Sequence, residues 1–161
     1  MKNKIIASHN KLKKVIHTLK KRNKKIVFTN GCFDLLHRGH IKYLAKAKQL
    51  GDYLIVAINS DESVKRIKGE NRPLTNQKDR AEILSSLEMV DFVTIFGDST
   101  PLRLIKFLKP DVLVKGADWK QKDIVGANFV KNYGGKVKRI LYLKGFSTTN
   151  LIAKIAKAFK K

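Results

Sequence analysis

Short apolar runs alternate with helical segments along almost the whole chain, and this alternation limits the possible folds. The apolar runs cover residues 26–29, 53–58, 92–96, 112–114 and 137–143. The segments between them carry apolar residues at helical spacing. Strands that alternate with helices predict a parallel sheet with right-handed crossovers and helices on both faces. We therefore expect an α/β, Rossmann-like sheet of about five strands.

Three loops that follow predicted strands are the expected location of a binding site. They cover residues 30–40, 115–119 and 144–149 and carry unusual combinations of polar residues and glycine. In open parallel sheets, ligands bind beyond the carboxyl ends of the strands, where the strand order reverses. We expect the functional site at this edge.

One domain accounts for the 161 residues. An amphipathic helix is predicted over residues 11–21, where apolar residues recur at i, i+3, i+4 and i+7 from Leu12. We expect this helix to lie within a leading segment, residues 1–23, followed by a catalytic core over residues 24–161.

The sequence predicts a cytoplasmic protein. No run approaches the ~20 apolar residues of a membrane span. The first ten residues lack the apolar region of a secretion signal. A single cysteine, Cys32, excludes an intramolecular disulfide and fits a reducing compartment.

The chain is strongly basic, with 35 lysines and arginines against 13 aspartates and glutamates and a formal net charge of +22. Such a charge attracts nucleic acid or an anionic membrane surface. However, the lysines are spread over almost every segment, and aromatic residues are not interleaved with them as base stacking would require. We expect a solvated lysine surface that favours anionic substrates, with no specific nucleic-acid or membrane partner. A basic nucleic-acid-binding domain is the alternative from another class.

The segment TNGCFDLLHRGH, residues 29–40, carries the main signature of a binding site. It joins a predicted strand to a predicted helix, and His37 and His40 flank Gly39 where the helix begins. A helix N-terminus presents free N–H groups and a partial positive charge, which suit an anion. Imidazole N–H groups can stabilise charge on phosphate oxygens, so we predict a site for nucleotide phosphates. The alternatives are capping histidines or a metal site; no Cys/His cluster supports the latter, and we expect no protein-bound metal.

Ser147, Thr148 and Thr149 open the last predicted helix. Hydroxyls at a helix N-terminus can form a second anion site, whereas an ordinary N-cap needs only one of them. The excess of hydroxyls favours a functional role.

Two basic residues and the cysteine are further candidates near the phosphates. Lys42 lies in the first turn of the helix after His40. Arg80 lies early in a later helix, and a guanidinium suits bidentate phosphate contact. Cys32 lacks the context of a nucleophile, so its backbone N–H is expected to matter more than its thiol.

Acidic and aromatic residues near the strand ends are candidates for substrate contacts. Asp34 can orient a histidine or a backbone amide. Asp61 and Asp118 follow strands and can bind sugar hydroxyls or Mg²⁺, and Trp119 can cover a base or close the pocket wall.

Four motifs in order resemble those of the cytidylyltransferase-type nucleotidyltransferase superfamily: NGCFDLLHRGH, VAINSDESVKRIKGENRP, LVKGADW and STTN. Within it, they are most similar to the bacterial D-glycero-β-D-manno-heptose 1-phosphate adenylyltransferases, and the similarity runs from about Lys24 to the C-terminus. The resemblance implies the HxGH nucleotidyltransferase fold. It also implies transfer of AMP from ATP to a sugar 1-phosphate, giving ADP-heptose and pyrophosphate for lipopolysaccharide-type glycans, with Mg²⁺ on the triphosphate.

The resemblance further implies the roles of individual residues. The catalytic residues would be His37, His40 and Lys42. The residues that bind the nucleotide and its phosphates would be Asn30, Gly31, Cys32, Phe33, Gly39, Gly116, Asp118, Ser147, Thr148 and Thr149. The residues that bind the substrate would be Asp34, Asp61, Arg80 and Trp119.

The chain also departs from related enzymes. Glycerol 3-phosphate cytidylyltransferases carry an arginine in R-T-E-G-I-S-T-T, whereas residues 142–149 here contain none. This difference favours ATP over CTP; a CTP-dependent enzyme acting on glycerol 3-phosphate or a similar alcohol phosphate is the alternative. In many bacteria, the heptose adenylyltransferase domain is fused behind a sugar kinase domain. This sequence shows no such kinase region, so we expect a separate kinase to supply the acceptor. A homodimer is common in the family and is expected here.

Overall fold

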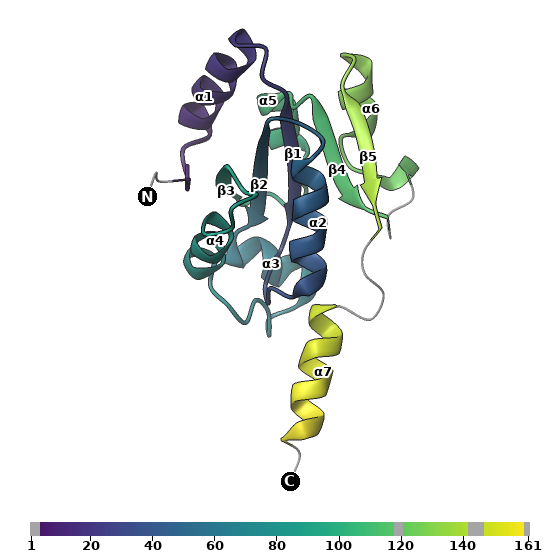
Figure 1. Ribbon diagram of the computed structural model, residues 1–161. Helices are drawn as coiled ribbons and strands as arrows, with labels where there is room; N and C mark the ends of the chain where they lie inside the picture. Colours follow the sequence, from purple (N-terminus) through teal and green to yellow (C-terminus); the bar gives the residue numbers. More distant parts are fainter. Residues whose placement is uncertain (1–3, 118–120, 142–146, 160–161) are drawn as a thin grey trace.

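The computed structural model describes residues 4–117, 121–141 and 147–159. Five described strands form one parallel sheet in the order β3-β2-β1-β4-β5 (Figure 1). The strands are β1 (Ile26–Gly31), β2 (Tyr53–Asn59), β3 (Phe92–Phe96), β4 (Val112–Gly116) and β5 (Lys136–Ile140). The helical elements are α1 (His9–Lys21), α2 (Arg38–Lys48), α3 (Asp61–Lys68), α4 (Gln77–Ser85), α5 (Leu102–Leu108), the 3₁₀ turn η1 (Gln121–Asp123), α6 (Ala127–Asn132) and α7 (Thr148–Ala158).

Two hydrophobic cores cover the two faces of the sheet, as predicted for a Rossmann-like fold. On one face, α2 and α4 bury residues such as Leu44 and Leu84 against the sheet. On the other face, α1, α5 and α6 bury Leu12, Ile105 and Val130. Alternate residues of one strand point into opposite cores because successive side chains of a strand face opposite sides. The predicted fold class is confirmed.

Side-chain caps explain where several helices begin. Ser8, Ser60, Asn76 and Ser147 each accept a hydrogen bond from a backbone N–H in the first turn of α1, α3, α4 and α7. These residues satisfy N–H groups that have no partner inside the helix.

Several strand boundaries differ from the sequence prediction. β1 continues through Asn30 and Gly31 because both still pair with β2. β4 likewise continues through Lys115 and Gly116, which pair with β5. β5 ends at Ile140, and the last two residues predicted for this strand lie outside the described part of the chain.

The strand order reverses beside β1. From β1 the chain builds β2 and β3 on one side and then crosses to build β4 and β5 on the other. The loops after β1 and β4 therefore leave the sheet in different directions, which opens a crevice at its carboxyl edge.

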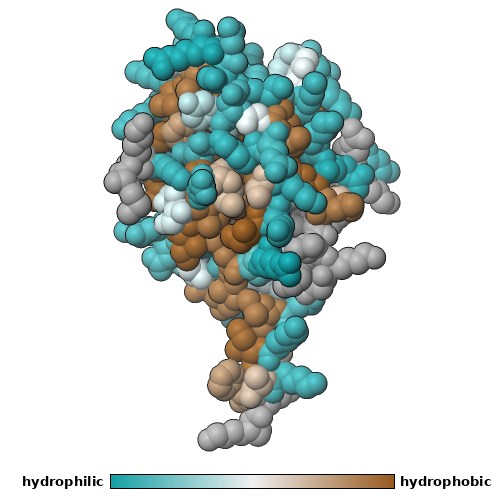
Figure 2. Space-filling model, in the orientation of Figure 1, coloured by the Kyte–Doolittle hydropathy of each residue, from teal (hydrophilic) through white to brown (hydrophobic). Residues whose placement is uncertain are grey.

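Helix α7 projects away from the sheet (Figure 1). None of its described residues is buried, and the side chains of Ile155 and Phe159 are 49% and 82% exposed. Figure 2 shows apolar surface along this helix. Among the described residues, no helix has the length and apolar character needed to cross a bilayer.

Candidate functional site

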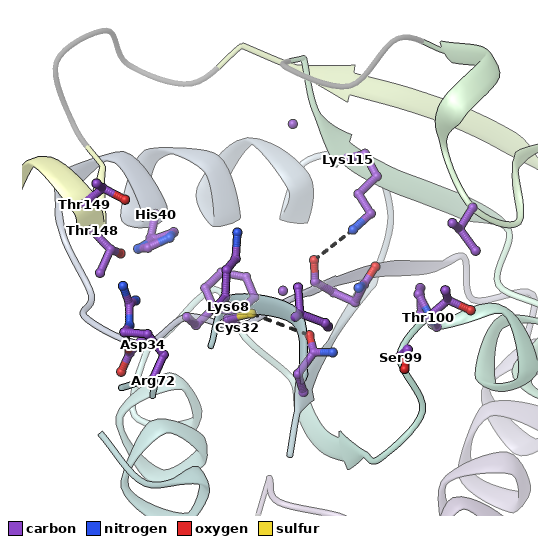
Figure 3. A pocket seen from close by; sticks show the side chains of 18 residues that line it. Cys32, Asp34, His40, Lys68, Arg72, Ser99, Thr100, Lys115, Thr148 and Thr149 are labelled. Atoms are coloured by element: carbon purple, nitrogen blue, oxygen red, sulfur yellow. Dashed lines mark hydrogen bonds and ion pairs between the residues drawn. The ribbon is translucent and has the colours of Figure 1, made fainter. Parts of the chain in front are cut away.

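A cavity of about 390 Å³ lies at the carboxyl edge of the sheet (Figure 3). It is lined by residues that follow β1, β2, β3 and β4 and by the start of α7. The lining residues are Asn30, Gly31, Cys32, Phe33, Asp34, His40, Asn59, Ile67, Lys68, Arg72, Ser99, Thr100, Pro101, Lys115, Gly116, Val125, Thr148 and Thr149. The predicted position at the strand-order reversal is therefore where the structure has its cavity.

The two histidines form a stacked pair at the start of α2. His37 is the N-cap residue, and its carbonyl oxygen accepts from the N–H of His40 at 2.9 Å. The imidazole centroids of His37 and His40 are 3.9 Å apart with 19° between the ring planes. The ring of Phe33 lies 5.2 Å from that of His40 and supports it from the loop. The spacing of three residues at a helix start thus stacks the two rings; His40 lines the cavity, and His37 is not among the lining residues.

The surroundings of both imidazoles favour the neutral form. Burial, together with the neighbouring His37, lowers the pKa of His40 to about 4. Burial also lowers the pKa of His37. The Nδ1 atom of His40 and the Oδ1 atom of Asn30 are buried and have no hydrogen-bond partner among the described residues. Polar atoms in this state are costly unless a ligand or water meets them.

The loop after β1 brings its backbone close to the cavity. Phe33 has a φ of +48°, which L-residues rarely adopt. A Cβ atom on Gly31 would lie only 3.0 Å from the Phe33 ring, so a larger residue would require the ring to shift. Such local strain is common where a backbone is shaped to meet a ligand.

The start of α7 meets this loop from the far end of the chain. Thr148 and Thr149 line the cavity, and the Thr148 hydroxyl donates to the carbonyl oxygen of Leu35 at 3.4 Å. Ser147 has the ordinary capping role, because its Oγ accepts from the N–H of Asn150 at 3.0 Å. The structure therefore brings the two predicted phosphate motifs together, and phosphate binding by Ser147 remains a prediction.

Asp34 is buried and fixes the neighbouring loop. Its carboxylate accepts from the N–H groups of Leu74 and Thr75 at 2.8 and 2.9 Å and from Arg72 Nε at 2.5 Å. Burial acts to raise the pKa of Asp34, but these donors outweigh it and hold the pKa below the ordinary carboxyl value. The carboxylate lines the cavity, yet its acceptor capacity is largely used by the protein.

Arg80 lies under the cavity rather than in it, with 1% of its surface exposed. Its guanidinium donates to the carbonyl oxygens of Thr75, Cys32 and Asn59 and to the carboxylate of Asp61, at 2.5 to 2.9 Å. This one side chain joins the loops after β1 and β2 to the start of α4. Direct substrate contacts by Arg80 and Asp61 stay predictions.

The remaining predicted residues fall into three groups. Gly39 is buried in the first turn of α2, and Gly116 lines the cavity. Lys42 is exposed on α2 and is not among the lining residues. Asp118 and Trp119 lie outside the described residues.

Cys32 lies against the cavity as a thiol. Its Sγ is 3.9 Å from the Oδ1 of Asn59, and burial raises its pKa. Thiolate chemistry at neutral pH is disfavoured by this shift, in keeping with the expected backbone role.

Sequence reasoning missed several residues that line the cavity: Asn59, Ile67, Lys68, Arg72, Ser99, Thr100, Pro101, Lys115 and Val125. Asn59 ends β2, Lys115 lies in β4 and Ser99 follows β3. The position of these three residues at or just after the carboxyl ends of strands could have indicated a role in binding, because ligands bind at that edge of a parallel sheet. Lys68 and Arg72 lie in the motif VAINSDESVKRIKGENRP, but no role was assigned to them in a chain with 35 basic residues.

Comparison with known proteins places the chain among nucleotidyltransferase-type sequences. Residues 28–153 match the family model described as cytidylyltransferase-like. Proteins named bifunctional protein HldE are similar over most of the chain: that of Campylobacter jejuni is 60% identical over 85% of this chain, and that of Geobacter metallireducens is 55% identical over 90%. The chain spans about 30% of the length of these curated relatives.

Two solved structures share the fold. The lipopolysaccharide core biosynthesis protein from Thermoplasma volcanium is 30% identical, with a TM-score of 0.60, covering 76% of this chain and 99% of that one. Pantoate-β-alanine ligase from Francisella tularensis, with β,γ ATP and β-alanine bound, has a TM-score of 0.63 at 20% identity, over 95% of this chain and 78% of that one. The second likeness supports the fold alone.

Replacing Arg80 by methionine should lower the free energy of unfolding by about 3–5 kcal/mol, because Asp61 and three carbonyl oxygens would lose a buried cationic donor. Lys78→Met, at an exposed position of the same helix, is the matched control and should change it by about 0.5 kcal/mol or less. Urea denaturation measures both. Equal unfolding midpoints for Arg80→Met and the unmodified protein would contradict this role of Arg80.

The neutral state of His40 should make stability depend on pH. Its pKa is about 4 in the folded protein against 6.5 for the ordinary residue, so the unfolded state binds more protons between these values. The free energy of unfolding should therefore fall as pH drops from 7 to 4.5, with about 2–3 kcal/mol due to His40. Urea denaturation of the protein and of His40→Gln across this range isolates the contribution; parallel pH profiles would refute it.

Proposed function

Because the chain belongs to the cytidylyltransferase-like family, we propose that it is an adenylyltransferase that transfers AMP from ATP to a sugar 1-phosphate. The proposed acceptor is D-glycero-β-D-manno-heptose 1-phosphate, and the products are ADP-heptose and pyrophosphate. The observation that carries this proposal is the meeting of His40, Thr148 and Thr149 around one cavity. The similarity to a lipopolysaccharide core biosynthesis protein agrees with it.

The proposed reaction is a direct in-line displacement. An oxygen of the sugar phosphate attacks the α-phosphorus of ATP, the new P–O bond forms, and the bond to the β-phosphate oxygen breaks. No covalent enzyme intermediate is required, because phosphoryl-type transfers depend mainly on positioning and on stabilising charge on the phosphate oxygens. We propose that His40, which lines the cavity, and His37, which stacks on it, supply N–H donors to these oxygens.

The leaving pyrophosphate is proposed to lie at the start of α7. The hydroxyls of Thr148 and Thr149 and the free N–H groups of this helix end suit an anion. A neutral His40 fits this arrangement, because it donates a hydrogen bond without adding a second buried charge next to His37.

Mg²⁺ is proposed to arrive with ATP. Among the described residues, no group of three or more His, Cys, Asp or Glu side chains can hold a metal ion. Asp34, which lines the cavity, already accepts hydrogen bonds from three donor groups. Mg²⁺ bound to nucleotides is commonly held by phosphates and waters with few protein ligands, and it would neutralise part of the triphosphate charge.

ATP is proposed rather than CTP because residues 142–149 contain no arginine. The proposed setting is the cytoplasm, in keeping with a free cysteine in the cavity. A homodimer is also proposed, with the apolar side of α7 covered by a second copy. Its support is the exposure of Ile155 and Phe159, because large apolar side chains gathered on one surface favour association.

Pyrophosphate release, measured for ATP and CTP with the heptose 1-phosphate and with glycerol 3-phosphate, tests the proposal. ATP with the heptose 1-phosphate should be the most active pair. His40→Ala should lower kcat by about 10²-fold or more, as expected for a lost donor to transition-state charge. His17→Ala, an exposed histidine of α1, should leave kcat unchanged. A near-normal kcat in folded His40→Ala, or preference for CTP, would overturn the assignment.

Light scattering coupled to size-exclusion chromatography tests the dimer. The protein should elute with twice the mass of the chain, and Ile155→Glu should yield the monomer by placing a charge in the apolar contact. Ile83→Glu is the control, since Ile83 is similarly exposed on α4. A monomeric unmodified protein, or a dimer that survives Ile155→Glu, would disprove this arrangement.

A further inference from the structure

We propose that Ser99 and Thr100 bind hydroxyl groups of the acceptor sugar, beside the buried amide of Asn59. This inference rests on the proposed function and assigns the sugar of the acceptor to residues for which the family resemblance implies no role. All three residues line the cavity. Asn59 ends β2, and Ser99 and Thr100 follow β3, so they come from the side of the sheet that β2 and β3 form.

The hydroxyls of Ser99 and Thr100 are not used by the fold. Serine and threonine directly before a helix ordinarily cap its first turn. Here, however, Pro101 is the N-cap residue of α5, and this helix has no side-chain cap hydrogen bond. Ser99 and Thr100 are exposed, and their hydroxyls have no hydrogen-bond partner in the part of the chain that the structure describes. Both hydroxyls are therefore available to a ligand.

A chain of buried hydrogen bonds fixes the loop that carries these hydroxyls. The Nδ2 atom of Asn59 donates to the Oγ of Ser63 at 2.9 Å, and this Oγ donates to the carbonyl oxygen of Asp98 at 2.9 Å. Asn59 and Ser63 are both buried. The side chain of Arg66 donates to the carbonyl oxygen of Gly97. The loop after β3 is therefore anchored on α3 at the two residues that precede the hydroxyls.

The same chain decides which way the amide of Asn59 faces. Because the proton of Ser63 is directed to a carbonyl oxygen, the Asn59 atom beside Ser63 must be the donor, Nδ2. The Oδ1 atom of Asn59 then faces Cys32, whose thiol lies 3.9 Å away and is a weak donor. Asn59 is only 4% exposed, and a buried amide oxygen with no stronger donor can still accept from a ligand hydroxyl.

The groups at this end of the cavity match a sugar better than a phosphate. A hydroxyl both donates and accepts, so Ser99 and Thr100 can pair with neighbouring ring hydroxyls in either direction. The Oδ1 atoms of Asn59 and Asn30 can only accept, and that of Asn30 is buried without a partner among the described residues. A fully ionised phosphate has no proton to offer these oxygens, whereas each sugar hydroxyl has one. Pro101 adds apolar surface to the lining, which suits the C–H groups of a sugar ring.

The direction of the proposed reaction brings the sugar to this end. In Figure 3, Thr148 and Thr149 lie on one side of His40, and Ser99 and Thr100 lie at the opposite end of the cavity. In-line displacement places the attacking oxygen opposite the leaving group. With the leaving pyrophosphate at the threonines of α7, the acceptor phosphate lies beyond His40, and its sugar extends toward Ser99. The nucleoside is attached to the α-phosphate and does not lie on this line.

Steady-state kinetics of the double variant Ser99→Ala/Thr100→Val test the proposal. Both changes remove a hydroxyl at an exposed position, so the fold should be kept. The KM for the heptose 1-phosphate should rise about tenfold, as expected when two hydrogen bonds between neutral groups are lost. The KM for ATP should change less than about twofold, because the contacts of the nucleotide are kept.

Thr18→Val and Ser86→Ala are the matched controls, since both residues are exposed and lie outside the cavity lining. Neither change should alter a KM. An unchanged acceptor KM in the double variant, or an equal or larger rise in the ATP KM, would overturn the sugar subsite.

A direct titration separates this inference from the proposed function. Calorimetry with mannose 1-phosphate and with inorganic phosphate measures what the sugar adds to binding. The unmodified protein should bind the sugar phosphate more tightly, and the double variant should bind it about tenfold more weakly while its affinity for inorganic phosphate is unchanged.

Three results of this titration would refute the subsite: equal affinities of the unmodified protein for the two ligands, no loss of sugar phosphate binding in the double variant, or an equal loss for both ligands. If no pair of nucleotide and acceptor releases pyrophosphate with the unmodified protein, the proposed function fails. The titration still decides the sugar subsite in that case, because it requires no turnover.

Discussion

The buried guanidinium of Arg80 is the interaction on which the shape of the cavity depends. It bonds to backbone oxygens in the loop after β1, at the end of β2 and before α4, and to the carboxylate of Asp61. A buried charge is tolerated only when nearly all of its donors are satisfied. The three segments must therefore reach their native positions together, and Asp34 adds a second tie between the loop after β1 and residues 72–75. These two networks together hold the loop after β1 against residues 72–75 and the end of β2.

The cavity lining offers two kinds of hydrogen-bond donor. The neutral donors include the ring of His40 and the hydroxyls of Thr148 and Thr149. The formal cations are Lys68, Arg72 and Lys115. Neutral, oriented dipoles suit charge that changes during a reaction, because they need little reorganisation. Formal cations suit a phosphate whose charge stays constant.

The fold and both phosphate motifs could be predicted from the sequence because each leaves a local pattern. Buried parallel strands are continuous apolar runs, and His37, His40 and the threonines lie at helix starts next to glycine or serine. The role of Arg80 left no local pattern. Its burial depends on carbonyl oxygens from segments up to 48 positions away, which only the folded chain brings together. Lys68 was equally hidden, since Lys65 and Arg66 precede it on the same helix.

The contact between Thr148 and Leu35 joins residues 113 positions apart, and it has a consequence for the order of events during synthesis. The last strand of the sheet ends at Ile140, before the segment that carries Thr148 and Thr149. All residues of the two hydrophobic cores are therefore translated before the threonine side of the cavity. Premature termination between these points would leave a folded sheet that keeps its histidines and lacks the partners proposed for pyrophosphate. Such a product would compete for nucleotide without turning it over.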